Sequence, residues 1–76
     1  MSNEAQTVYD LMLERFKQTG ERHVEIRVPM ELRNKRQDIV SELQFEGLIS
    51  DADIHGQQNI SCTLTDENLC IVSIEY

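Results

Sequence analysis

The chain has 76 residues, of which 39% are hydrophobic and 28% charged, and its net charge is −7. This balance is typical of one small globular domain with a modest core, and it excludes an intrinsically disordered chain. Apolar runs such as Leu11-Met12-Leu13 are far too short for a membrane-spanning helix. The first ten residues have neither a basic stretch nor an apolar core, so we expect no secretory signal and a cytoplasmic protein.

The charges are divided unevenly along the chain. All seven Lys and Arg residues lie between Arg15 and Arg36, whereas residues 37–76 carry eight acidic side chains and sum to −8. An acidic chain repels phosphate backbones at long range. A nucleic-acid contact therefore needs a local basic patch, and a protein partner with a basic surface is favoured by the same distribution.

The first part of the chain predicts a helix and then a strand. Ser2 or Asn3 can cap a helix over residues 3–18, and Gly20 can end it. Its apolar stripe recurs at helical spacing and consists of Ala5, Val8, Tyr9, Met12, Leu13 and Phe16. Leu11 lies at the edge of this stripe and is expected to be partly exposed. Residues 23–28 alternate between polar and apolar side chains, which predicts a half-buried strand that Pro29 ends.

Residues 30–46 leave two interpretations open. One is a short helix at 30–35, a polar turn near Asn34-Lys35 and a second helix from about 36 to 46, which Gly47 ends. The other is one continuous helix over 30–46 packed on a small antiparallel sheet, because nothing in the polar run of residues 33–38 breaks a helix outright.

The second half of the chain is predicted to form strands. We expect residues 49–65 to form a hairpin with its tip at residues 56–59, and residues 69–76 to form a last strand. Its two cysteines, Cys62 and Cys70, are too few for a disulfide scaffold and are interpreted as small buried residues, although a bond between them stays open.

The order helix, strand, helix, helix, hairpin resembles the winged-helix family of helix-turn-helix domains. Two segments carry the resemblance, Leu43-Gln44-Phe45-Glu46-Gly47-Leu48-Ile49 and Leu64-Thr65-Asp66-Glu67-Asn68. They are similar to the family signature L-x-x-x-G-L-I … L-T-x-x-G, with Asn68 in place of the last glycine. The resemblance covers residues 5–68 by element order and implies a winged-helix arrangement. Together with the length of the chain and the strand expected at 69–76, the prediction is a single α+β domain over residues 1–76 with an extra C-terminal strand.

The same resemblance implies a DNA-binding regulatory protein, of a kind common in phages and mobile elements. The family's third helix enters the major groove. Here its N-terminus and the preceding turn carry residue types suited to phosphates and base edges. These candidate nucleic-acid-binding residues are Arg33, Asn34, Lys35, Arg36 and Gln37.

A second hypothesis follows from the acidic half of the chain. The third helix and the wing carry no basic residue beyond Arg36, which departs from a surface suited to phosphates. They can instead form a protein-binding surface that docks on a basic partner as an inhibitor, adaptor or nucleic-acid mimic. Its candidate residues are Asp38, Glu42, Phe45, Glu46, Asp51 and Asp53. For Phe45, packing under the wing or the last strand is favoured over exposure as an anchor. Self-association through the first helix or the terminal segments is a further expectation.

Catalysis and metal binding find little support in the sequence. It contains no nucleophile elbow, glycine-rich phosphate loop or cofactor motif, so we expect a non-catalytic protein without cofactors. Asp51, Asp53 and His55 would share one face of a regular strand. A polar wing face explains this pattern better than a metal site, because such a strand offers too few ligands.

Overall fold

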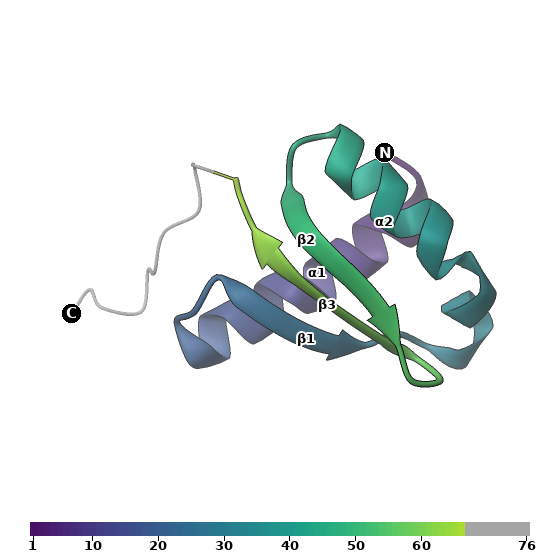
Figure 1. Ribbon diagram of the computed structural model, residues 1–76, viewed down its shortest axis with the longest axis horizontal. Helices are drawn as coiled ribbons and strands as arrows, with labels where there is room; N and C mark the ends of the chain where they lie inside the picture. Colours follow the sequence, from purple (N-terminus) through teal and green to yellow (C-terminus); the bar gives the residue numbers. More distant parts are fainter. Residues whose placement is uncertain (67–76) are drawn as a thin grey trace.

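The computed structural model describes residues 1–66 and has an α+β fold, as predicted. In chain order its elements are α1 (Asn3–Thr19), β1 (His23–Arg27), the 3₁₀-helix η1 (Met30–Lys35), α2 (Arg36–Phe45), β2 (Ile49–His55) and β3 (Asn59–Leu64). The strands form one antiparallel sheet in the order β1-β3-β2 (Figure 1). The strand predicted at 69–76, together with Asn68 and Cys70, lies outside the described residues.

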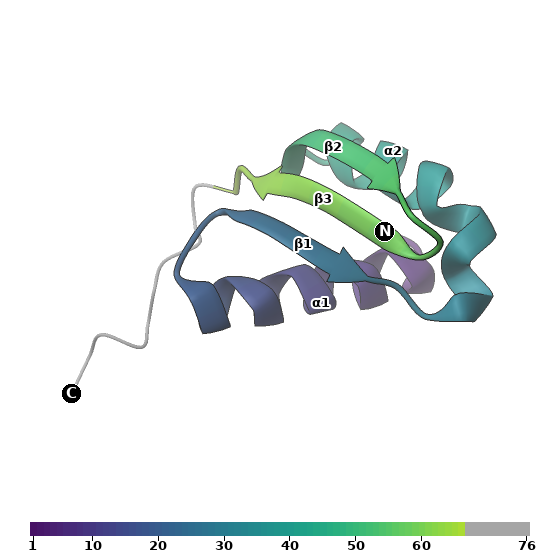
Figure 2. The same ribbon diagram turned by 60° about the horizontal axis from the view of Figure 1, so that its bottom comes forward.

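The two α-helices pack against one face of the sheet (Figure 2). Alternate residues of β1 and β3 are buried, and they join apolar residues of both helices in one core. Met12, Leu43 and Cys62, from three different elements, are completely buried in it. The opposite face of the sheet carries polar side chains, as the alternation in residues 23–28 predicts.

The ends of α1 follow from their capping residues. The Ser2 hydroxyl accepts a hydrogen bond from the Ala5 amide at 3.1 Å, which satisfies one of the free donors of the first turn. At the other end Gly20 adopts a φ of 73° and its N–H donates to the Phe16 carbonyl. The helix predicted at 3–18 is therefore confirmed, with Thr19 added at its end.

The segment over residues 30–46 is not one α-helix, so the interpretation as a continuous helix is wrong. Residues 30–35 form a 3₁₀-helix with no buried residue, and α2 begins directly after it at Arg36. Lys35, with φ −102° and ψ 5°, marks the change. The apolar spacing explains the result, because only Met30 and Leu32 are apolar here, too few to hold a longer α-helix on the core. The three α-helices expected for a winged helix are reduced to two.

The hairpin over residues 49–65 is confirmed, with one irregularity in β2. The pairing jumps from Ser50 opposite Thr63 to Asp53 opposite Ser61, and Asp51 between them has a φ of 52°. This bulge has a physical cause. Ile49 and Ile54 are an odd number of residues apart, so a regular strand would point them to opposite faces, whereas the extra residue lets both pack on the core.

The expectations for membrane-spanning helices and for Cys62 can be compared with the structure. No helix within residues 1–66 is long and apolar enough to cross a membrane. Cys62 has a free thiol and is completely buried in β3, as expected, and its Sγ lies 3.6 Å from the Met12 sulfur.

Candidate functional site

The predicted nucleic-acid-binding residues lie where η1 meets α2, at one end of the hairpin. Four of them are exposed, namely Arg33, Asn34, Lys35 and Gln37. Arg36 is half-buried. The structure therefore brings all five together on one segment, but it gives two of the three cations partners within the fold.

Arg36 connects α2 to the tip of the hairpin. Its Nη1 donates to the carbonyl oxygens of His55 and Asn59, both at 3.0 Å, and its Nε donates to the Arg33 carbonyl at 3.0 Å. Because the guanidinium is charged, its hydrogen bonds to these carbonyls are charge-assisted and are stronger than bonds between neutral groups. Arg36 therefore holds the hairpin against the helix, and its side chain is not available to a phosphate without breaking these bonds.

Lys35 pairs with the first turn of α1. Its Nζ lies 3.3 Å from a carboxylate oxygen of Glu4. A backbone hydrogen bond to Glu4, and then the hydrogen bond from Lys35, hold the pKa of this carboxyl below its ordinary value. Both side chains are largely exposed, so this pair contributes little to stability.

Three residues of the predicted set keep polar groups directed to solvent. Within residues 1–66 the side chains of Arg33 and Asn34 make no hydrogen bond or ion pair. Gln37 donates only a long bond of 3.4 Å to the Ser41 hydroxyl, one turn along the helix. The outward face of α2 continues this exposed surface and consists of Gln37, Asp38, Ser41, Gln44 and Phe45.

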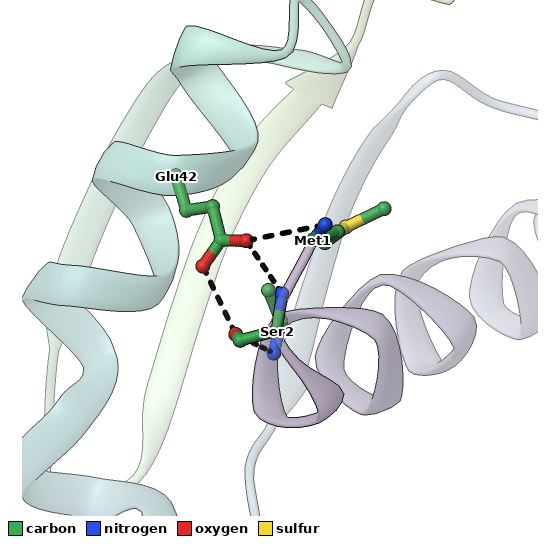
Figure 3. A network of polar contacts seen from close by, with 4 residues as sticks. Met1, Ser2 and Glu42 are labelled. Atoms are coloured by element: carbon green, nitrogen blue, oxygen red, sulfur yellow. Dashed lines mark hydrogen bonds and ion pairs between the residues drawn. The ribbon is translucent and has the colours of Figure 1, made fainter.

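Glu42, one of the candidates for protein binding, is used inside the fold. Its carboxylate accepts hydrogen bonds from the Ser2 amide at 2.6 Å and the Ser2 hydroxyl at 2.9 Å, and it lies 3.9 Å from the Met1 amino group (Figure 3). The network joins α2 to the start of α1, so Glu42 has a structural role that the sequence does not reveal.

Phe45 does not pack under the wing, which corrects that part of the interpretation favoured from the sequence; the last strand, the other expected cover, lies outside the described residues. The Phe45 side chain is 88% exposed, more than any other large apolar side chain among residues 1–66. The helical rotation explains this position, because Phe45 lies two residues, about 200°, from the completely buried Leu43. It ends α2, and the chain then turns away through Glu46 and Gly47, whose φ of 76° is left-handed.

The remaining acidic candidates are all exposed. Asp38 lies in the first turn of α2, Glu46 follows its last turn, and Asp51 and Asp53 lie in β2. Asp51 occupies the bulge, and no group of three or more metal-ligating side chains converges anywhere in the described part of the chain. These residues therefore present negative charge to solvent on α2 and on the strand that follows it.

The two segments of the sequence signature meet in space. The Thr65 amide donates to the Leu48 carbonyl at 3.0 Å and its hydroxyl donates to the Gly47 carbonyl at 2.9 Å. Leu43 and Leu64 are both buried nearby in the core. The end of α2 is thus fastened to the end of the hairpin.

Comparisons with protein-family models, with curated proteins and with solved structures find no match for this chain.

Proposed function

We propose that this chain is a non-catalytic interaction module with a winged-helix arrangement, in which η1 takes the place of the second helix. The element order and the β2–β3 hairpin that follows α2 support the arrangement. The contacts from Thr65 to Gly47 and Leu48 support it as well, because they connect the two segments on which the resemblance rests.

We propose that the module binds a protein partner through the outward face of α2. Phe45 carries this proposal. The side chain of Phe45 is 88% exposed and presents a large apolar surface to water. Aromatic side chains are enriched at the positions that contribute most of the binding energy in protein interfaces. Phosphate backbones offer no comparable partner for such a ring at the end of a helix.

Two acidic residues close to Phe45 favour a basic partner surface. Asp38 is exposed on the same outward face of α2, Glu46 follows Phe45 directly, and no Lys or Arg follows Arg36 in the sequence. Asp53 pairs with Ser61 and therefore lies on the polar face of the sheet, away from the helices. Opposite charges across an interface raise the association rate and exclude partners of like charge. Glu42 is left out of the proposed surface because Ser2 occupies its carboxylate.

Affinity capture of the partner by the full chain tests this proposal. Reversing Asp38 and Glu46 to Lys is expected to lower recovery of the partner at least about tenfold, and added salt is expected to do the same to the unmodified chain. Glu21→Lys is the matched control, because Glu21 is exposed between α1 and β1 and away from α2. Equal losses in the control and in the Asp38/Glu46 variant would refute a specific surface.

DNA contact is the second candidate, and one observation favours it. The side chains of Arg33 and Asn34 have no polar partner within residues 1–66, and Gln37 lies one turn further along the same surface. Arginine and amide side chains are suited to guanine and adenine edges. This smaller surface would contact DNA through the junction of η1 and α2.

A fluorescence titration with duplex DNA at low salt separates the two candidates. DNA contact predicts binding that Arg33→Ala and Asn34→Ala weaken while the fold is retained. Arg36→Ala is unsuited to this test, since it also removes the bonds to the hairpin. Absence of binding by the unmodified chain at low salt would exclude the DNA candidate.

A further inference from the structure

We propose that β1 pairs with β1 of a second copy of this chain, so that two sheets join into one across an antiparallel dimer. This surface is separate from the outward face of α2 and does not depend on the function proposed for it. β1 is the end strand of the sheet, and among residues 1–66 no strand pairs with its outer edge, beside which α1 runs (Figure 2).

The backbone of β1 has hydrogen-bonding groups free for such a pair. The Leu64 amide of β3 donates to the Arg22 carbonyl, just before β1, at 2.8 Å. The Val28 amide, just after β1, donates to the Gln58 carbonyl in the turn before β3, also at 2.8 Å. Because alternate residues of an antiparallel strand bond the same neighbour, the even-numbered residues of β1 bond β3. The N–H and C=O groups that face the free edge therefore belong to His23, Glu25 and Arg27.

The two edges of the sheet differ in how they are protected. On the opposite edge, the bulge at Asp51 breaks the regular ladder of β2, a device that discourages pairing with another strand. β1 has no bulge and no proline within His23–Arg27, and its register with β3 is regular throughout. The structure therefore leaves β1 as the edge able to accept a strand.

The charges of β1 are complementary to those of a second β1. Glu25 and Arg27 lie two residues apart on the polar face of the sheet. An antiparallel pair with Ile26 at the two-fold axis places Glu25 opposite the second copy's Arg27, and the converse pair follows by symmetry. A register centred on Glu25 would instead place two carboxylates opposite each other, which disfavours it.

Contacts within one chain leave these charges available. Glu25 uses one carboxylate oxygen, Oε2, for the Asn59 amide at 3.1 Å and for His55 at 3.5 Å. The bond from Arg27 to the Gln58 side chain is long, at 3.5 Å. The second oxygen of Glu25 and most donors of the Arg27 guanidinium can thus face the second copy.

The flank of α1 beside β1 adds an apolar contact. A shallow hollow of about 190 Å³ lies between them, and Leu11, 36% exposed, lines it together with Ile26. Glu14 and Arg15 line the same hollow. Because Leu11 lies beside Ile26, which is at the two-fold axis, the pairing brings the Leu11 side chains of the two copies together.

Sedimentation equilibrium of the full chain, from about 10 μM to about 1 mM, tests the dimer. We expect association with a micromolar dissociation constant, because an interface of this size is small. Glu25→Arg and Arg27→Glu each place like charges opposite one another and are expected to weaken the dimer about tenfold or more. The double swap Glu25→Arg/Arg27→Glu restores opposite charges and is expected to restore association.

Rescue by the swap separates pairing from a merely structural role, since both single variants also lose contacts within the chain. Arg33→Glu, an exposed charge reversal on η1, is the matched control and is expected to leave association unchanged. Should the single variants not fold, amide shifts of the unmodified chain on dilution provide a second measurement, with changes expected at Glu25 and Arg27. A monomer at every concentration, or a swap that fails to restore the dimer, would overturn the proposal.

Discussion

The carboxylate of Glu42 on α2 holds Ser2, the residue that caps α1, through hydrogen bonds of 2.6 Å from its amide and 2.9 Å from its hydroxyl. The same hydroxyl accepts a bond from the Ala5 amide. A hydroxyl can donate once and accept twice, so Ser2 performs both tasks at the same time. One side chain of α2 thereby orients the cap of the other helix.

Glu42→Ala is expected to destabilise the domain by about 1–2 kcal/mol, because it removes two charge-assisted bonds and releases the cap of α1. Urea unfolding of the two proteins measures the difference. Glu42→Gln, which keeps an acceptor oxygen, should lie between them. Stability unchanged by Glu42→Ala would mean that the network does not hold the helices together.

Arg36→Ala is expected to cost about 1–3 kcal/mol, since the carbonyls of His55 and Asn59 lose their common donor. The loss should appear in urea unfolding and as faster amide exchange at the hairpin tip. Arg36→Lys keeps the charge without the planar fork, so it should recover only part of the stability. Arg33→Ala, which removes no side-chain hydrogen bond within residues 1–66, is the control and should be nearly neutral.

The sequence predicts the local elements well for physical reasons. Ser2 and Gly20 set the ends of α1, the alternation in residues 23–28 sets β1, and Gly56 to Asn59 set the hairpin tip. Each of these signals depends on neighbours within a few residues. The α+β class follows from them directly.

Contacts between distant residues could not be predicted in the same way. The hairpin carbonyls that Arg36 binds lie 19 and 23 residues away, and Ser2 lies 40 residues from Glu42, so both charges looked available for binding. The bulge at Asp51 could have been predicted from the sequence. Ile49 and Ile54 are an odd number of residues apart, so a regular strand cannot place both of them on the core. The exposure of Phe45 could also have been predicted, because its side chain lies about 200° around the helix axis from that of the buried Leu43.

Burial raises the pKa of the Cys62 thiol from 9.0 to about 11. Below about pH 9 the thiol is protonated in both the folded and the unfolded chain. Between pH 9 and 11 the unfolded chain loses this proton and the folded chain keeps it, so the stability falls as the pH rises, by about 2–3 kcal/mol in total. Cys62→Ala should remove this part of the alkaline loss in urea titrations. An identical pH dependence in both proteins would contradict the buried thiol.

Gly47→Ala tests the turn after α2. The residue has a φ of 76° and an added Cβ would meet no atom within 4 Å, so the cost comes from the backbone alone. We expect a loss of about 1–2 kcal/mol in thermal unfolding. Gly47→Asn should cost less, because asparagine tolerates a left-handed conformation better than alanine. Equal losses for the two substitutions would argue against this conformation.

The outward face of α2 as a protein-binding surface is tested most directly by Phe45→Ala, with partner recovery and thermal unfolding measured on the same preparation. The ring is 88% exposed, so we expect the unfolding temperature to stay within about 2 °C of the original. Recovery of the partner should fall at least about tenfold, as for the removal of an aromatic anchor. Undiminished recovery, or a large drop in the unfolding temperature, would contradict this role of Phe45.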